Sequence, residues 1–364
     1  MRPRIQTLDG LRFVAAIGVV WIHAWTFHGN ARCHIGPVDI ADLLAIGGNG
    51  VDLFFVISGF CMYFFYASKT DFSYPDFSRF LVKRWIRLSP AFYAATVVYF
   101  LRNLYIAGHF SSSDLWSLPV SLFYLNSILQ EHSVATHFWT LGVEWQFYLI
   151  VPFLLIYQNR IGFKKTFGII FSLLGLLAVV SVLLYRDRLD ILTDQLLFRG
   201  AEFGAGIIAG RLLLMGKAIF HMRRFWFVFF FVLAYAGRVL LSKPILHLSA
   251  DYYNLFKLCG FTVMGMGFGG ILYLALTSSD ILERVLGNGL FKTMGKISYS
   301  FYLWHALIVP FVAGLTNRYA PFAKGLTAPL ITTILSAVIL YPVSLLSYRL
   351  LEKPFLSGGN LTTK

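Results

Sequence analysis

Long apolar runs alternate with short polar segments along the chain, and this pattern predicts membrane-spanning helices. A helix needs about 20 mostly apolar residues to cross a hydrocarbon core about 30 Å thick. Ten runs are long enough: 9–28, 47–67, 88–107, 138–158, 166–185, 193–214, 225–241, 253–276, 296–316 and 326–351. A further stretch, 115–130, is interrupted by Pro119 and Asn126, which predicts an interfacial or re-entrant segment.

The composition is that of an integral-membrane protein. Of the 364 residues, 57% are hydrophobic and only 13% are charged, whereas soluble domains carry about 25% charged residues. The net charge of +14 lies mostly in short segments between apolar runs, as topology signals do, and this distribution argues against nucleic-acid binding. With both termini in the cytoplasm, most basic residues lie inside. The predicted fold is therefore all-α, with about ten transmembrane helices and cytoplasmic termini.

No repeat or linker marks a second domain. We expect one integral-membrane domain, 1–356, followed by a short cytoplasmic tail, 357–364. Neither the three cysteines nor the nine histidines show the spacing of metal ligands, so no metal site is predicted.

The first apolar run carries two ionisable residues, Arg12 and His23, eleven positions apart. Because a helix turns 100° per residue, the two side chains return to within about 20° of one face, roughly 16 Å apart along the axis. We therefore expect a cation near the membrane surface and an imidazole deep in the hydrocarbon region. Ionisable groups at such depth are costly and usually functional.

Two carboxylates in apolar runs are candidate catalytic groups. Asp52 opens the second run, where it could be a helix cap stabilised by the helix dipole or an acid that orients His23 or a substrate. Glu144 lies among aromatic residues in the fourth run and needs a basic or hydrogen-bonding neighbour to keep its charge. Gly59, in the middle of the second run, favours close helix packing over ligand approach.

Arg84 and Arg87 lie three residues apart in FSRFLVKRWIRLSP, which we interpret as an inner loop with a helical face. One interpretation is a topology signal that contacts lipid head groups. The other is an anion clamp, since the planar guanidinium fork suits phosphate oxygens. The two are compatible.

Three more residues are candidate substrate contacts. Trp139 is suited either to an interfacial aromatic belt or to stacking on a sugar. Tyr302 and His305 share the upper half of the ninth run, where His305 is equally suited to packing and to chemistry. Arg199 and Glu202, three apart in the sixth run, predict an internal ion pair.

Six segments of the chain, in family order, resemble the acyltransferase-three family of multi-spanning bacterial membrane acyltransferases. They are LDGLRFVAAIGVVWIHAW, NGVDLFFVISGF, RWIRLSPAFY, FWTLGVEWQFYLIVP, GKISYSFYLWH and YRLLEKPF. The most specific element is the spacing of Arg12 and His23 combined with Arg84-x-x-Arg87. Many members carry an additional periplasmic esterase-like domain, and this chain resembles the stand-alone form.

The resemblance implies acyl-CoA, most often acetyl-CoA, as a cytoplasmic co-substrate, with no permanently bound cofactor. It implies a sugar hydroxyl as the acceptor, on a cell-surface polysaccharide such as an exopolysaccharide or lipopolysaccharide, or on its lipid-linked precursor. It also implies a multi-pass protein of the bacterial cytoplasmic (inner) membrane. By the same resemblance, Arg12, His23, Arg84 and Arg87 occupy positions associated with activity.

The expected mechanism joins these residues. Arg12 and the two loop arginines would hold the phosphates of coenzyme A, and its arm would run along the first helix to His23. His23 would act as general base on the acceptor hydroxyl, with Asp52 or Glu144 fixing the imidazole tautomer. A covalent acyl-histidine intermediate stays open.

Two alternatives remain on the sequence alone. The intramembrane charges could serve a transporter as a proton or substrate site, although no inverted repeat is visible. Alternatively, the acceptor of an acyltransferase could be a small molecule such as a macrolide. The sequence leaves the oligomeric state open.

Overall fold

The computed structural model describes residues 6–32, 34–35, 38–39, 44–67, 72–111, 114–184, 189–216, 222–241, 250–277 and 281–357. This part of the chain is almost entirely helical, with one pair of two-residue antiparallel strands, β1 (His34–Ile35) and β2 (Val38–Asp39). The predicted all-α class is confirmed apart from this small pair. The predicted tail, 357–364, lies outside the described residues except for Ser357.

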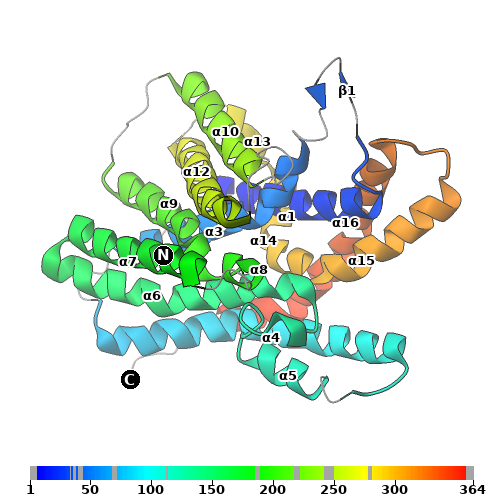
Figure 1. Cartoon of the computed structure of the whole chain (residues 1–364), viewed down its shortest axis with the longest axis horizontal. Coiled ribbons are helices and arrows are strands. Elements are labelled where there is room, and N and C mark those ends of the chain that lie inside the picture. Colours follow the sequence, from blue (N-terminus) through cyan, green and yellow to red (C-terminus); the bar gives the residue numbers. More distant parts are fainter. Residues whose placement is uncertain are drawn as a thin grey trace. The chain divides into compact units, whose positions relative to one another are not determined.

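The ribbon in Figure 1 consists mostly of helices. Their contacts divide the chain into two compact units. The first comprises Met1–Val51, Lys83–Phe110 and Asp280–Lys364, and the second comprises Asp52–Val82 and Ser111–Ser279. Helix α4 (Tyr74–Ala107) is divided between them.

In the first unit, α1 is the central helix, because it packs against η1, α13, α14, α15 and α16. The elements of this unit, besides β1, β2 and part of α4, are α1 (Gln6–Phe27), η1 (Ala45–Asn49), α13 (Ile281–Leu286), α14 (Gly289–Lys296), α15 (Ser298–Tyr319), α16 (Thr327–Ser347), the π-helical segment η5 (Tyr348–Glu352) and α17 (Lys353–Ser357).

In the second unit, α12 packs against α9 and α10, and α7 packs against α6 and α9. Its elements, besides part of α4, are α3 (Gly50–Tyr66), α5 (Asp114–Leu122), η2 (Gln130–His132), η3 (Thr136–Phe138), α6 (Trp139–Ile161), α7 (Phe163–Leu184), α8 (Leu189–Thr193), α9 (Leu196–Leu214), α10 (Arg223–Leu240) and α12 (Ala250–Thr277).

Seven helical stretches of the described chain are long and apolar enough to cross a membrane. They are Gln6–Phe27, Ala45–Tyr66, Thr136–Ile161, Phe163–Leu184, Phe256–Thr277, Ser298–Tyr319 and Thr327–Leu356. The other three expected spans, 88–107, 193–214 and 225–241, fall on α4, α9 and α10. These helices carry more charge; α9 alone holds Arg199, Glu202 and Arg211. The count of ten and the cytoplasmic termini stay predictions.

Two segments, 115–130 and the basic segment around Arg84 and Arg87, are neither simple loops nor complete membrane spans. The stretch 115–130 begins with α5, whose nine residues cover roughly 14 Å and are too short to cross the hydrocarbon core. The segment around Arg84 and Arg87 was expected to be an inner loop with a helical face, ahead of the span 88–107. It is instead continuous with that span in one helix, α4, with Pro90 in its interior. Proline is tolerated inside such helices because neighbouring groups satisfy the freed backbone carbonyl.

Glycines allow the backbones of neighbouring helices to touch in both units. A Cβ atom on Gly59 of α3 would overlap the backbone carbonyl oxygen of Phe203, and one on Gly206 of α9 would overlap that of Val56. In the first unit, a Cβ atom on Gly295 would overlap the carbonyl oxygen of Asp9. Small residues at helix interfaces are the usual means of close packing in membranes. The packing role predicted for Gly59 is therefore confirmed.

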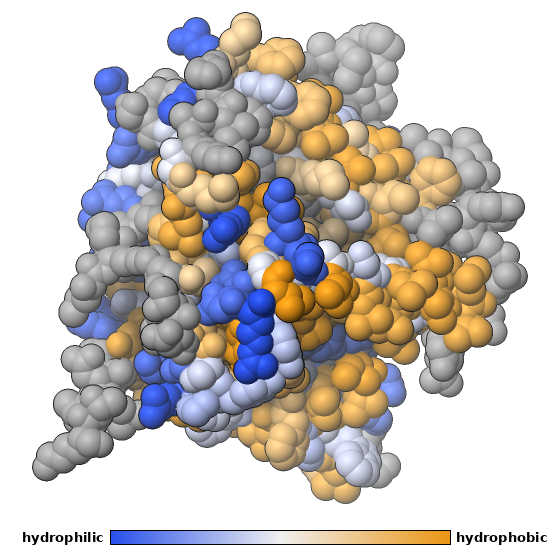
Figure 2. Space-filling view, turned by 90° about the vertical axis from the view of Figure 1, so that its left-hand side faces the viewer, coloured by the Kyte–Doolittle hydropathy of each residue, from blue (hydrophilic) through white to orange (hydrophobic). Residues whose placement is uncertain are grey.

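Much of the exposed surface is hydrophobic, as expected for a protein surrounded by lipid. On the face in Figure 2, hydrophobic residues cover broad areas, and hydrophilic residues form smaller groups among them. The exposed apolar side chains of α7 illustrate this: Ile169, Leu176 and Leu183 are each about 60% exposed (61%, 60% and 61%).

Candidate active site

Helix α1 holds Arg12 and His23 on one face. It runs without a break from Gln6 to Phe27, so the eleven-residue spacing keeps its helical register. The Arg12 guanidinium donates to the Asp9 carboxylate at 3.2 Å, and Asp9 is fully buried. His23 is half-buried and lies about 10 Å beyond the middle of α1 toward its C-terminal end. The imidazole is thus nearer the end of the helix than its centre.

His305, on α15, lies beside His23. The two imidazole ring centroids are 5.0 Å apart, with an interplanar angle of 37°. The Tyr302 ring lies 5.3 Å from that of His305. The His305 side chain is fully buried, and its Nδ1 bonds the backbone carbonyl oxygen of Tyr302. Because a carbonyl oxygen only accepts, Nδ1 carries the proton and a neutral His305 presents Nε2 as an acceptor.

Two tyrosine hydroxyls join α4 to α15. They therefore position Arg84 and Arg87 of α4 relative to His305 of α15. Tyr99 on α4 donates to the carbonyl oxygen of Leu303 at 3.0 Å, and Tyr299 on α15 donates to that of Leu88 at 3.0 Å. Leu88 follows Arg87 directly. On this anchored helix Arg84 is half-buried and Arg87 is exposed.

A buried carboxylate near the end of the chain was not predicted as part of the site. Glu352 accepts a hydrogen bond from the Ser300 hydroxyl, which also bonds Ser347 at 2.8 Å. Arg87 interacts electrostatically with the same carboxylate. Glu352 and Arg349, three residues earlier, lie in a segment that winds as a π-helix.

In the second unit, Asp52 belongs to a buried cluster around Arg199. The Arg199 guanidinium lies 2.5 Å from the Asp52 carboxylate, 3.3 Å from Glu202 and 4.0 Å from Asp194. It also lies 3.7 Å from the ring centroid of Phe261, a cation–π contact. The predicted ion pair between Arg199 and Glu202 is confirmed. Asp52 lies in the first turn of α3, where the helix dipole favours a carboxylate.

Glu144 has the hydrogen-bonding neighbours that its position required. Its carboxylate accepts from the Ser58 hydroxyl at 2.9 Å and from the Tyr148 hydroxyl one turn further along α6. Trp139 is the first residue of α6, and its ring centroid lies 5.1 Å from the Arg199 guanidinium carbon. These contacts give Glu144 and Trp139 defined positions within the second unit.

The structure thus brings together some predicted site residues. His23, Tyr302 and His305 form one contiguous group in the first unit. Asp52 and Glu144 belong to the second unit, and their predicted action on His23 stays a prediction. The contact between His23 and His305 was not predicted, because no local spacing signals a contact between the first and ninth apolar runs.

A family model described as an acyltransferase domain matches residues 5–349. The chain belongs to this acyltransferase family. The resemblance seen in the sequence segments is thereby confirmed over nearly the whole chain.

Two relatives of this acyltransferase-family chain are named O-acetyltransferases. The O-acetyltransferase OatA of Staphylococcus aureus is 26% identical over 390 residues, covering 98% of this chain and 58% of that protein. The peptidoglycan O-acetyltransferase OatA of Listeria monocytogenes is 24% identical over 392 residues, covering 98% of this chain and 57% of that protein. The chain thus spans less than two thirds of these relatives.

A shorter relative is matched over most of its length. The putative acetyltransferase ORF330 of Acidianus two-tailed virus is 26% identical over 308 residues, covering 84% of this chain and 83% of that protein. No solved structure matches the chain.

Proposed function

We propose that the chain is a membrane O-acyltransferase that moves an acetyl group from acetyl-CoA to a hydroxyl of a cell-wall polysaccharide or its lipid-linked precursor. The family match over residues 5–349 and the names of the relatives support O-acetyl transfer. The observation that carries the proposed chemistry is the half-buried His23 imidazole against His305, on the same helix face as Arg12.

His23 is proposed as the general base. It takes the proton of the acceptor hydroxyl, whose oxygen then attacks the thioester carbonyl carbon and forms the ester bond. The carbon–sulfur bond breaks, and the leaving thiolate of coenzyme A takes the proton from the imidazolium. The histidine returns to its neutral form, so protons and charge balance without a further reactant.

His305 is proposed as a positioning residue for that base. It is fully buried, and its Nδ1 is held by the Tyr302 carbonyl, so the ring has one fixed orientation. Packing against this ring limits the rotamers of His23 and aims its imidazole. The role in substrate binding predicted for Tyr302 and His305 stays a proposal.

Arg12, Arg84 and Arg87 are proposed to bind the phosphates of the donor on the cytoplasmic side. Guanidinium groups form paired, charge-assisted hydrogen bonds with phosphate oxygens. Helix α4 presents an exposed Arg87 and a half-buried Arg84 one turn apart. Roughly 16 Å of helix separates Arg12 from His23, a distance that the extended arm of coenzyme A would span.

Mass spectrometry of surface glycans tests this proposal. Cells would express the wild type, His23→Ala or His28→Ala, with equal membrane levels checked by immunoblotting. His28 is a matched control because it lies one residue past α1 and bonds Thr332 at 2.8 Å. We expect O-acetylated sugars with the wild type and His28→Ala and none with His23→Ala. Glycans that are identical in all strains would contradict a polysaccharide acceptor.

A further inference from the structure

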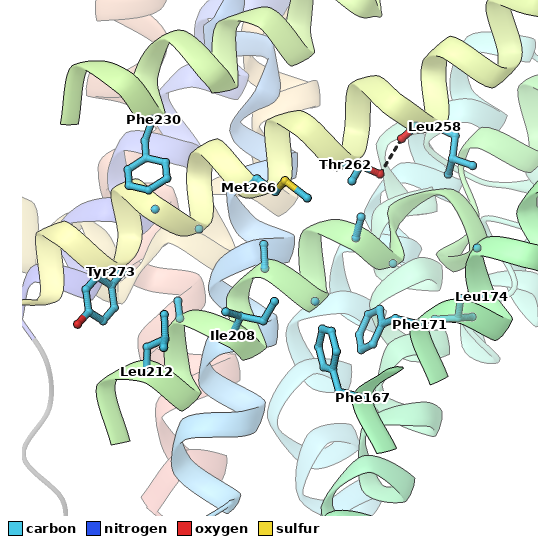
Figure 3. A pocket seen from close by; sticks show the side chains of 18 of the residues that line it. Phe167, Phe171, Leu174, Ile208, Leu212, Phe230, Leu258, Thr262, Met266 and Tyr273 are labelled. Atoms are coloured by element: carbon cyan, nitrogen blue, oxygen red, sulfur yellow. Dashed lines mark hydrogen bonds between the residues drawn. The ribbon is translucent and has the colours of Figure 1, made fainter. Parts of the chain in front are cut away.

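A cavity of about 500 Å³ lies within the second unit, among α7, α9, α10 and α12 (Figure 3). The close-up shows Phe167 and Phe171 of α7 on one side, Ile208 and Leu212 of α9 below, and Met266 of α12 above. The rings of Phe167 and Phe171 stack with their centroids 4.2 Å apart. None of these residues takes part in the proposed chemistry.

The lining of this pocket has almost no polar character. Only two of its lining residues, Thr262 and Tyr273, have polar side chains, and none is charged. The Thr262 hydroxyl donates to the carbonyl oxygen of Leu258 at 2.9 Å, so its donor is used within α12 (Figure 3). A polar ligand would lose its hydrogen bonds to water here without replacement. The pocket therefore suits a hydrocarbon.

The wall formed by α7 indicates where such a ligand comes from. Only 17% of the most apolar 18-residue stretch of α7 is buried. Its side chains Leu173 and Leu176 are 53% and 60% exposed. A helix this apolar on its outer face lies against lipid tails. The hydrocarbon available beside the pocket is thus the acyl chains of the bilayer.

The size of the pocket limits the occupant to something slender. The four helices around this space of about 500 Å³ already pack against one another, so it suits a slender chain better than a further helix, which is 10–12 Å wide with its side chains. Helices α9 and α12 contribute glycines to its lining, among them Gly200, Gly204, Gly269 and Gly270.

We propose that this pocket binds one fatty-acyl chain of a membrane phospholipid. The chain fills the apolar space among the four helices while the head group stays at the membrane surface. The lipid acts as a structural ligand of the second unit, and this role is independent of the proposed acetyl transfer.

Two glycines of α7 allow a matched test. Gly175 lines the pocket, and a Cβ atom there meets no atom within 4 Å, so a large side chain at this position extends into the cavity. Gly168, on the same helix, has equally open surroundings but does not line the pocket. Gly175→Phe therefore blocks the pocket, and Gly168→Phe adds the same ring elsewhere.

Native mass spectrometry of the full-length protein, released from membranes in mild detergent, counts the retained lipids. The wild type and Gly168→Phe should retain one phospholipid more than Gly175→Phe. Equal lipid counts in all three proteins, equal loss in both variants, or retention of an isoprenoid lipid instead of a phospholipid would overturn the proposal.

A second measurement does not depend on the folding of a variant. A phospholipid with a photoreactive group on its acyl chain is added to wild-type protein in nanodiscs, and the labelled peptides are mapped. Label on Ile208, Leu212 and Phe230 of the pocket wall is expected. Label confined to the outer face of α7, at Leu173 and Leu176, would show contact with bulk lipid only and would refute the pocket as a lipid site.

Discussion

Replacing Arg199 by methionine should strongly destabilise the second unit. The Arg199 side chain is 9% exposed, that of Asp52 4% and that of Glu202 0%. Removing the guanidinium leaves two buried carboxylates without their nearest cation and removes the contact with Phe261. Breaking a buried ion pair by deleting one partner costs about 3–5 kcal/mol. We expect the free energy of unfolding of Arg199→Met to fall by that amount.

Equilibrium unfolding in mixed micelles with a denaturing detergent measures this loss. Arg211→Met is the control on the same helix, since Arg211 is half-buried and bonds the Tyr63 hydroxyl at 3.5 Å; its loss should be about 1 kcal/mol. Adding Asp52→Asn to Arg199→Met should recover part of the stability, because one uncompensated charge is then removed. Additivity of the two changes within about 0.5 kcal/mol would refute the coupling between them.

Three further results follow from the same contacts. His305→Ala should lower kcat for acetyl transfer more than it raises KM for the acceptor, whereas an unchanged kcat would exclude a positioning role. Arg84→Ala and Arg87→Ala should each weaken acetyl-CoA binding in calorimetric titrations. The loss of affinity relative to the wild type should shrink at high salt, because salt screens charge interactions. Unchanged affinity would leave the two arginines as topology signals. Gly59→Leu should prevent accumulation of folded protein because the side chain overlaps the Phe203 carbonyl oxygen, while Gly168→Leu, with open space around it, should fold normally.

Features set by local helix geometry were predictable from the sequence. The shared face of Arg12 and His23 needs only an unbroken helix, and α1 is unbroken. The pair of Arg199 and Glu202 likewise follows from a spacing of three. The family segments predicted the acyltransferase domain for the same reason: they are short, local patterns with defined spacing.

Contacts between distant segments were not predictable in the same way. His305 contacts His23 and Ser300 bonds Glu352 because helices far apart in the sequence pack together, and apolar periodicity does not say which helices are neighbours. The continuity of the basic segment around Arg84 with the span 88–107 in one helix was not predicted, because basic clusters between apolar runs usually mark a loop. In a membrane protein, surrounding helices can satisfy the backbone that proline leaves open.

The most direct test of the proposed chemistry is acetyl transfer by purified protein in proteoliposomes with isotope-labelled acetyl-CoA and a glycan acceptor. General-base catalysis contributes about 10²–10⁴-fold. The rate of label transfer should therefore fall by about that factor in His23→Ala, with the helical circular dichroism unchanged, and stay near the wild-type rate in His28→Ala. Full transfer of label by a correctly inserted His23→Ala protein would contradict His23 as the base.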